Sequence, residues 1–334
     1  MGKVQVGVVG VGWIAQVIHL PILVKLPDVQ VVAICDKDKP KARFVAEKFS
    51  VRRYYNDLEE MLLEEDLSAI DVCTSTDAHK EVAQRALRAK KAVFVEKPLA
   101  RKFAEAKEIN DVARREKSLL MVGMNNRFRP DAMILKSFVE GGELGKVFYV
   151  KAGWLKKEST QKPWLKQKEK AGGGVLLDLG IVMVDLAMWM LGYPVGIRIS
   201  AVNFKHTTKN VEDSSTVFMA VKNGGTLTVD VSWMLHVDHE TFYFDLYGTQ
   251  GSATLSPLKV NKELYGNLVN VAPAKIESPQ VLYRKSYENE LKHFIGAAKG
   301  LHPVISTGDE AVQRMRIIDA IYKSAAKGRE IILR

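Results

Sequence analysis

The start of the chain follows a strand–turn–helix pattern that strongly constrains the fold. An apolar run, Lys3–Val9, leads into the turn Gly10-Val11-Gly12-Trp13-Ile14-Ala15, and a helical pattern then extends to about Leu26. Glycines permit a tight turn and a close approach of the backbone to a phosphate, and a small residue such as Ala15 lets helix and strand pack closely. The free backbone N–H groups at such a helix start bind pyrophosphate. The pattern therefore predicts a βαβ unit with a dinucleotide held at Gly10, Gly12, Trp13 and Ile14, although a βαβ unit without a ligand has the same outline.

A second apolar run, Val29–Cys35, ends in Asp36. An acid about 20 residues past the glycine turn accepts hydrogen bonds from the ribose hydroxyls of a bound dinucleotide. The same carboxylate repels the additional phosphate of NADP, which favours NAD as the cofactor. Lys37 and Lys39 follow closely and offset part of this repulsion, so the sequence leaves NADP open as a second cofactor.

Strand-like and helical segments alternate over the next part of the chain. Strands are predicted at residues 69–74, 92–95 and 119–124, and helices at 57–65, 79–89 and 103–116. This alternation indicates a parallel sheet with helices on both faces, in which ligands bind at the carboxyl ends of the strands. The polar residues that follow two of these ends are therefore candidate cofactor ligands: Thr74, Ser75, Thr76, His79, Glu96 and Lys97.

Lys97 is the strongest candidate for a chemical role. It follows the predicted strand at residues 92–95, and Pro98 favours an extended backbone at the residue before it. An ammonium group at this place can stabilise a developing alkoxide and pass a proton. The alternative is a surface lysine paired with Glu96.

The pattern changes after about residue 124. Strands are predicted at residues 146–155, 196–206, 214–221, 226–235, 240–247 and 251–255, and helices at 172–191, 287–299 and 309–327. The strict alternation in Thr226–Trp233 indicates a sheet with one buried face, and Asn223-Gly224 just before it is a strong hairpin signal. We therefore expect an α/β protein with two domains: a Rossmann domain over residues 1–123 with a doubly wound parallel sheet, and an α+β domain over residues 124–334 with a large open, mostly antiparallel sheet.

A very apolar segment follows the glycine triplet Gly172–Gly174. If it is helical, Asp178, Val182 and Asp185 share one face, because they are spaced i, i+4, i+7. Polar groups on such a helix cost free energy unless they are hydrogen-bonded or functional. Asp178 is a candidate catalytic residue with helix capping as the alternative, and Asp185 has a buried structural hydrogen bond as its alternative. The two aspartates also argue against a membrane span, since each costs about 2.5–3.5 kcal/mol near the bilayer centre.

The chain has 334 residues, a net charge of +10 and two cysteines. Its basic residues are spread along the whole length without a nucleic-acid-binding motif, so we expect no nucleic-acid partner. The densest group, the seven lysines between Lys151 and Lys170, forms either a solvated loop or an attractive field for an anionic substrate.

Cysteine and histidine usage gives no sign of a metal. Cys35 and Cys73 suit a reducing cytoplasm and form no metal motif, and His236 and His239 have no helical spacing or partner cluster. The patterned start of the chain is unlike a signal peptide. We therefore expect a cytoplasmic protein without a metal.

Seven longer motifs resemble one known family. They are GVVGVGWIAQVIHLP at 7–21, VCTSTDAHKEVAQRAL at 72–87, VFVEKPLA at 93–100, GMNNRFRP at 123–130, GGGVLLDLG at 172–180, YGTQGSATL at 247–255 and YKSAAKGREI at 322–331. The chain is similar, nearly from end to end, to the glucose-fructose oxidoreductase / inositol dehydrogenase / rhizopine-catabolism (Gfo/Idh/MocA) family of NAD(P)-dependent oxidoreductases. The resemblance implies hydride transfer at a carbinol or carbonyl of a sugar, inositol or related polyol, with Lys97 and Asp178 as catalytic residues. It also implies that Asn125 and Arg127 lie near the cofactor and substrate, and that open sheets pair into homodimers or homotetramers.

One position departs from the family pattern. Many members read D-x-x-x-H-x-x-D in the helix, with the histidine as acid/base, whereas this chain has Val182 at that place. Three interpretations remain open: Lys97 with Asp178 suffices, a histidine such as His236 replaces the missing one, or the chain is an NAD-binding regulator without redox turnover. A fourth is the transient use of bound NAD in glycoside cleavage. Candidate substrate contacts are Lys97, Arg127, Trp154, Asp178, Val182 and Trp233, with Lys156 and Trp164 as further pocket candidates.

Overall fold

The computed structural model describes residues 2–157, 163–222 and 224–334. The chain forms two compact units, one of Met1–Asn125 with Tyr287–Met315 and one of Asn126–Ser286 with Arg316–Arg334. The first unit covers the expected N-terminal domain and adds the segment Tyr287–Met315, which the sequence assigned to the second domain. Two helices, α9 (Pro279–Ala298) and α10 (Gly308–Lys327), therefore contain the points where the chain passes from one unit to the other.

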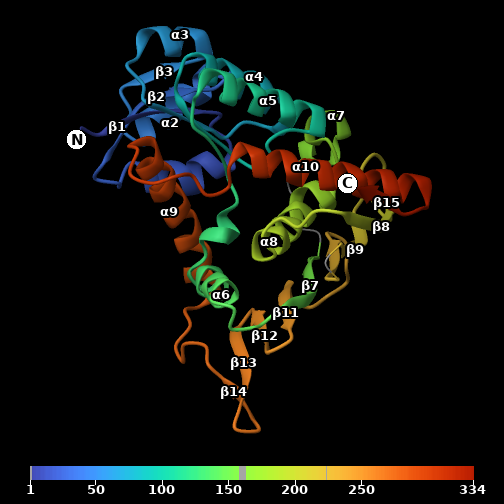
Figure 1. The fold of residues 1–334 in the computed structure, drawn as a ribbon. Helices are drawn as coiled ribbons and strands as arrows, with labels where there is room; N and C mark the ends of the chain where they lie inside the picture. The colour runs from blue at the N-terminus through green and yellow to red at the C-terminus, as the bar shows by residue number, and fades with distance from the viewer. Residues whose placement is uncertain (1, 158–162, 223) are drawn as a thin grey trace. The chain divides into compact units, whose positions relative to one another are not determined.

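The first unit is built on a six-stranded sheet in the order β3-β2-β1-β4-β5-β6, and all of its strand pairs are parallel (Figure 1). The strands are β1 (Val4–Val9), β2 (Val29–Cys35), β3 (Arg53–Tyr55), β4 (Ala69–Val72), β5 (Ala92–Val95) and β6 (Leu120–Val122). Every residue of β4 is buried, as expected for a strand covered on both faces. The structure confirms the doubly wound parallel sheet.

Helices connect these strands. They are α2 (Lys39–Lys48), α3 (Leu58–Glu64), α4 (Thr76–Arg88) and α5 (Phe103–Glu116), of which α4 and α5 lie side by side in Figure 1. The sequence missed α2, because its buried stripe consists of only Ala42, Val45 and Ala46 in an otherwise polar segment. Its start is nevertheless well defined, since the Asp38 carboxylate accepts the backbone N–H of Lys41.

The glycine turn after β1 has the expected form. Gly10 has a φ of +87°, and a Cβ placed there would lie 2.7 Å from the Cα of Thr74, so a larger residue does not fit. The helix that follows begins with a π turn, η1 (Ala15–His19), and continues as α1 (Leu20–Leu23), which ends short of the expected Leu26. π turns inside helices are rare and occur frequently at functional sites.

The second unit holds a nine-stranded sheet in the order β14-β13-β12-β11-β7-β10-β9-β8-β15. Its strands are β7 (Val147–Leu155), β8 (Ile197–Phe204), β9 (Ser214–Val221), β10 (Thr226–Ser232), β11 (Thr241–Gly248), β12 (Gly251–Leu255), β13 (Leu258–Leu264), β14 (Asn267–Asn270) and β15 (Ile331–Leu333). Among the described strands of this sheet, only β7 and β10 pair in parallel, which confirms the expected mostly antiparallel sheet.

The strands β13 and β14 of this unit were not predicted from the sequence. The polar strands β13 and β14 form a hairpin at one end of the sheet (Figure 1), and every residue of β14 is exposed, so no buried alternation marks it in the sequence. β9 and β10 pair as the predicted hairpin, although Asn223 of the predicted turn lies outside the described residues, as does Lys162 of the lysine group.

The helical segments of the second unit lead to the candidate site. They are α6 (Pro130–Glu140), η3 (Pro163–Lys166), α7 (Lys168–Ala171), η4 (Leu176–Gly180) and α8 (Ile181–Met190), and a short 3₁₀ turn, η2 (Asn125–Phe128), lies where the two units join in sequence. By length and composition Lys168–Met190 alone among the described segments could cross a membrane, but 89% of its most apolar window is buried inside the protein. This is the behaviour of a core helix, so the segment is weak evidence for a membrane span.

Candidate active site

The turn after β1 offers the space and the donors that a pyrophosphate needs. A Cβ added at Gly12 would meet no atom closer than the carbonyl oxygen of Cys73 at 4.0 Å. The helix start behind it has no side-chain cap, and the ring of Trp13 is half exposed beside its N-cap residue, Ile14. The hydroxyl of Thr74 is buried and makes no hydrogen bond to any described residue. A ligand phosphate at this turn fits both the open glycine and the unsatisfied hydroxyl.

Asp36 lies at the carboxyl end of β2, beside the same turn. Its Oδ2 accepts the backbone N–H of Val11 at 2.9 Å, and its Oδ1 accepts that of Asp38 at 3.1 Å. The Lys41 ammonium is 3.3 Å from Oδ2. The sequence pointed to Lys37 and Lys39 as the nearby cations, whereas Lys41, one helical turn into α2, makes this ion pair.

His79 forms hydrogen bonds with both the loop after β4 and the loop after β5. Its ring is buried, with Nδ1 2.8 Å from the carbonyl oxygen of Pro98 and Nε2 3.1 Å from that of Thr74. Burial lowers the pKa of His79. The predicted ligands Ser75 and Thr76 begin α4, where the Ser75 hydroxyl donates to Asp77 at 2.5 Å. The contacts of His79 therefore fix the shape of the two loops, and its role toward the cofactor remains a prediction.

Glu96 and Lys97 follow β5. The Oε2 of Glu96 accepts the backbone N–H of Lys97 at 3.0 Å, and Oε1 lies 3.0 Å from Nε2 of His19. The Glu96 side chain is only 11% exposed, and the charge of Lys97 helps to lower its pKa, so the alternative of a surface lysine paired with Glu96 stays a prediction. Glu96 thus lies in the interior and holds the main chain at Lys97.

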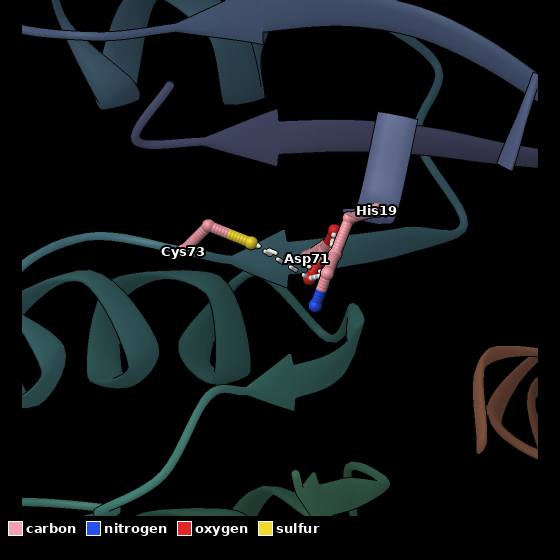
Figure 2. A group of neighbouring side chains, drawn as sticks. All are labelled: His19, Asp71 and Cys73. Carbon is pink, nitrogen blue, oxygen red and sulfur yellow. Dashed lines mark hydrogen bonds and ion pairs between the residues drawn. The ribbon is translucent and has the colours of Figure 1, made fainter. Parts of the chain in front are cut away.

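His19, Asp71 and Cys73 form a buried cluster behind these residues (Figure 2). His19 Nδ1 is 2.9 Å from Asp71 Oδ2 and 3.3 Å from Cys73 Sγ. A nitrogen, an oxygen and a sulfur atom within 4.8 Å of one another resemble a metal site, which the sequence did not suggest. Hydrogen bonds account for these distances, however, and burial raises the pKa of the Cys73 thiol far above its usual range.

In the second unit, Glu212 shapes the glycine triplet. Its Oε1 accepts the backbone N–H groups of Gly174 and Leu176 at 2.9 and 3.1 Å, and the Tyr322 hydroxyl at 2.7 Å. A Cβ at Gly173 would lie 1.9 Å from the Tyr322 hydroxyl oxygen, and one at Gly174 would lie 1.9 Å from the carbonyl oxygen of Glu212. The glycines are therefore required by close packing, and neither Glu212 nor Tyr322 was singled out from the sequence.

Asp178 lies inside the π turn that follows the triplet. The indole N–H of Trp233 donates to its Oδ2 at 3.3 Å. The N-cap residue of η4 is Val175, which makes no side-chain cap bond, and the capping alternative for Asp178 stays a prediction. Trp233 is 1% exposed, which gives its ring no open face for a sugar in this structure, and its contact here is with Asp178. Val182, on the next turn, is buried.

Arg127 and Asp185 form a fully buried ion pair. Arg127 Nε and Nη2 donate to the two carboxylate oxygens of Asp185 at 2.8 and 2.6 Å, and the Tyr193 hydroxyl also contacts both side chains. Asp185 is 0% and Arg127 1% exposed. The structural alternative proposed for Asp185 is what the structure shows. Arg127, predicted near cofactor and substrate, joins the 3₁₀ turn η2 to helix α8.

The remaining aromatic pocket candidates, Trp154 and Trp164, lie in the second unit. Trp154 on β7 donates its indole N–H to Glu240, and the Lys156 ammonium lies 4.3 Å from the Trp154 ring centroid and 3.1 Å from Glu240 Oε1. Trp164 is half-buried in η3, and His236 is exposed between β10 and β11. Trp154 and Lys156 thus form one half-exposed group with an acidic partner.

The comparisons with known proteins agree with these features. Residues 4–124 match the oxidoreductase family with an NAD-binding Rossmann fold, and residues 133–254 match the Gfo/Idh/MocA C-terminal domain. The fold and the dinucleotide site define an NAD-binding oxidoreductase. The chain belongs to the Gfo/Idh/MocA family, as its motifs had suggested.

Relatives match over nearly the whole length. A D-glucoside 3-dehydrogenase from Escherichia coli K12 is 27% identical over 98% of this chain and 97% of its own. A myo-inositol 2-dehydrogenase from Thermotoga maritima is 25% identical over 98% of each chain. Among solved structures, GenD2 from gentamicin A biosynthesis, in complex with NAD, has a TM-score of 0.87 with 26% identity over 100% of this chain and 97% of that chain.

Proposed function

We propose that the protein transfers a hydride between NAD and a carbinol or carbonyl of a sugar, inositol or related polyol. The observation that carries this proposal is the place of Lys97, which follows β5 at the carboxyl edge of the parallel sheet with its backbone held by Glu96. Dinucleotides bind at this edge. The names of the glucoside and inositol dehydrogenases among the relatives support the substrate class.

The residues of this chain supply the proton chemistry of that reaction. Bound NAD supplies the hydride acceptor at its nicotinamide. In the oxidation direction, Lys97 accepts the hydroxyl proton and stabilises the negative charge that develops on the carbinol oxygen. Asp178, oriented by Trp233, is the second proposed catalytic residue and binds a substrate hydroxyl.

Val182 limits which residues can carry the proton. A valine has no ionisable group, so the ionisable residues on this helix face are Asp178 and Asp185, and both carboxylate oxygens of Asp185 accept hydrogen bonds from Arg127. The alternatives of an NAD-binding regulator and of an NAD-dependent glycosidase gain no support from the relatives above, which are named dehydrogenases. A panel of sugars, inositols, polyols and sugar acids, assayed for NADH formation at 340 nm, tests the proposal. It fails if no compound supports turnover in either direction.

We expect NADH to bind more tightly than NADPH, on the order of tenfold, a free-energy difference of about 1.4 kcal/mol. The Asp36 carboxylate attracts ribose hydroxyls and repels a 2′-phosphate, while Lys41, which is paired with it, reduces the repulsion. Fluorescence titration with both cofactors measures the ratio. Asp36→Ala is expected to reduce the ratio of the Kd for NADPH to the Kd for NADH. Asp66→Ala, at an exposed site elsewhere in the same unit, leaves this ratio unchanged. Tighter binding of NADPH by the unaltered protein contradicts the assignment.

The rate of carbinol oxidation is expected to rise with pH through one ionisation that belongs to Lys97. A base must lose its own proton before it can accept one from the substrate, so the rate increases as the pH rises. That ionisation disappears in Lys97→Met, measured on the residual rate. His236→Ala and His239→Ala leave it in place, because both histidines are exposed. Its loss in either histidine variant identifies a substitute histidine as the base.

We further propose a homodimer or homotetramer formed through the open sheet of the second unit, in the cytoplasm. Val202, Phe204 and Phe218 lie on one face of β8 and β9 and are 54%, 42% and 44% exposed. An exposed apolar patch of this kind marks an interaction surface. Phe218→Lys is expected to shift the mass measured by light scattering to the monomer, whereas Leu63→Lys, 84% exposed on α3, leaves it unchanged. A monomeric unaltered protein contradicts the proposal.

A further inference from the structure

The imidazole of His19 lies between two carboxylates from neighbouring strands of the first unit. Nδ1 is 3.1 and 2.9 Å from the two oxygens of Asp71, and Nε2 is 3.0 Å from Oε1 of Glu96. A neutral imidazole has one N–H and can donate to only one of these carboxylates, whereas an imidazolium donates to both. His19 is 0% and Asp71 1% exposed, so water does not satisfy them. The geometry favours the imidazolium.

The surroundings agree with a charged ring. Burial by itself lowers the pKa of His19, but the charge of Asp71 and the hydrogen bonds to Asp71 and Cys73 outweigh burial and leave the pKa well above its ordinary value. The aromatic rings of Phe94 and Tyr287 lie 5.6 and 6.2 Å from the imidazole, centroid to centroid. The cation is therefore enclosed by its carboxylate partners and by apolar walls.

A further acid, Glu290 of α9, borders the same cluster. Burial and the charge of Glu96 raise its pKa well above the ordinary value. Its Oε1 accepts the backbone N–H of Met124 at 2.5 Å. Asp71 and Glu96 are the carboxylates within hydrogen-bond distance of the His19 ring among the described residues.

Glu96 contacts both His19 and Lys97. One carboxylate oxygen binds His19 and the other accepts the backbone N–H of Lys97 at 3.0 Å. Burial raises the pKa of Glu96, but the hydrogen bond and charge of His19 and the charge of Lys97 outweigh it and lower the pKa. A Cβ at Gly123 would lie 3.4 Å from Glu96 Cδ, so the carboxylate is also packed from that side.

We propose that His19 is a positioning residue for Lys97. As an imidazolium it fixes the carboxylate of Glu96, and Glu96 fixes the main chain from which the Lys97 side chain projects. The proposal rests on the function given above, in which Lys97 is the catalytic lysine. His19 acts through Glu96 and makes no contact with the reacting atoms.

Two measurements test the contacts from His19 through Glu96 to Lys97 without any substrate. Nitrogen NMR of the protein labelled at histidine is expected to show both ring nitrogens of His19 protonated at about pH 8, assigned by the loss of the signals in His19→Gln. Hydrogen exchange of the Lys97 amide is expected to be at least about tenfold faster in His19→Gln. Asn110→Ala, which removes a buried hydrogen bond to Asp309 elsewhere in the unit, leaves that exchange rate unchanged. A singly protonated ring, unchanged exchange in His19→Gln, or stoichiometric metal bound at His19 overturns the proposal.

Kinetic measurements then test whether the effect of His19 on turnover depends on Lys97. His19→Gln is expected to lower kcat by about 10- to 100-fold, since a misplacement of about 1 Å can cost 10²-fold, while the Kd for NADH changes by less than about threefold. In a Lys97→Met background, His19→Gln is expected to cause no further loss, because residues that act as a unit are not additive. Equal losses in both backgrounds contradict the positioning role. If the unaltered protein turns over no substrate, the proposed function fails, and the NMR and exchange results still decide the role of His19.

Discussion

Replacing Lys97 with methionine is expected to lower turnover by about 100-fold or more, the usual scale for a lost proton-transfer group. The change keeps the apolar stem of the side chain and removes its ammonium. The backbone N–H of residue 97 still binds Glu96, so the loop after β5 keeps its shape. The Kd for NADH, measured by fluorescence, therefore changes little, and the loss appears in kcat.

A matched control separates this effect from a general loss of positive charge. Lys102→Met removes an exposed lysine at the N-cap of α5 and is expected to keep full turnover. Asp178→Asn is expected to lower turnover as well, because it removes a carboxylate that Trp233 holds in place. Full activity of Lys97→Met on the true substrate contradicts the assignment of Lys97 as the catalytic residue.

Replacing Asp185 with alanine is expected to lower the free energy of unfolding by about 3–5 kcal/mol, the usual cost of removing one partner of a buried ion pair. The guanidinium of Arg127 is 1% exposed and loses both of its hydrogen bonds to the carboxylate. Urea denaturation followed by tryptophan fluorescence measures the loss.

The comparison variant is Asp319→Ala, which removes an exposed i, i+4 pair with Lys323 on α10. It is expected to change stability by less than about 0.5 kcal/mol, as is usual for surface pairs. A loss below about 1 kcal/mol in Asp185→Ala shows that the Arg127–Asp185 pair contributes little to stability. Arg127 is then better interpreted as a residue that binds cofactor or substrate.

The local patterns in the sequence predicted the supporting framework of the site well. The glycine turn, the strand ending in Asp36 and the position of Lys97 after β5 depend on short-range rules of turn and strand chemistry, and the structure contains all three. The hairpin of β13 and β14 was missed, because β14 is exposed throughout and the buried alternation of β13 is limited to Leu258 and Val260.

The interior polar contacts could not be predicted in this way. His19 contacts Asp71 and Glu96 across 52 and 77 positions of sequence, and Arg127 contacts Asp185 across 58. No spacing rule connects residues on different elements at such separations. His19 carried one usable signal, a titratable residue inside a mostly apolar helix that follows the glycine turn, where burial without a partner is costly.

The two π turns also decide where these helices can change length. An i→i+5 turn holds one residue more than an i→i+4 turn, so deleting one residue within Leu176–Gly180 converts it to ordinary α-helix and leaves the register of α8 unchanged. A deletion within Ile181–Met190 instead rotates the buried side chains beyond it by about 100° and places them against the wrong neighbours. A single-residue deletion at this turn is therefore expected to change the surroundings of Asp178 while the hydrophobic interior around α8 stays intact.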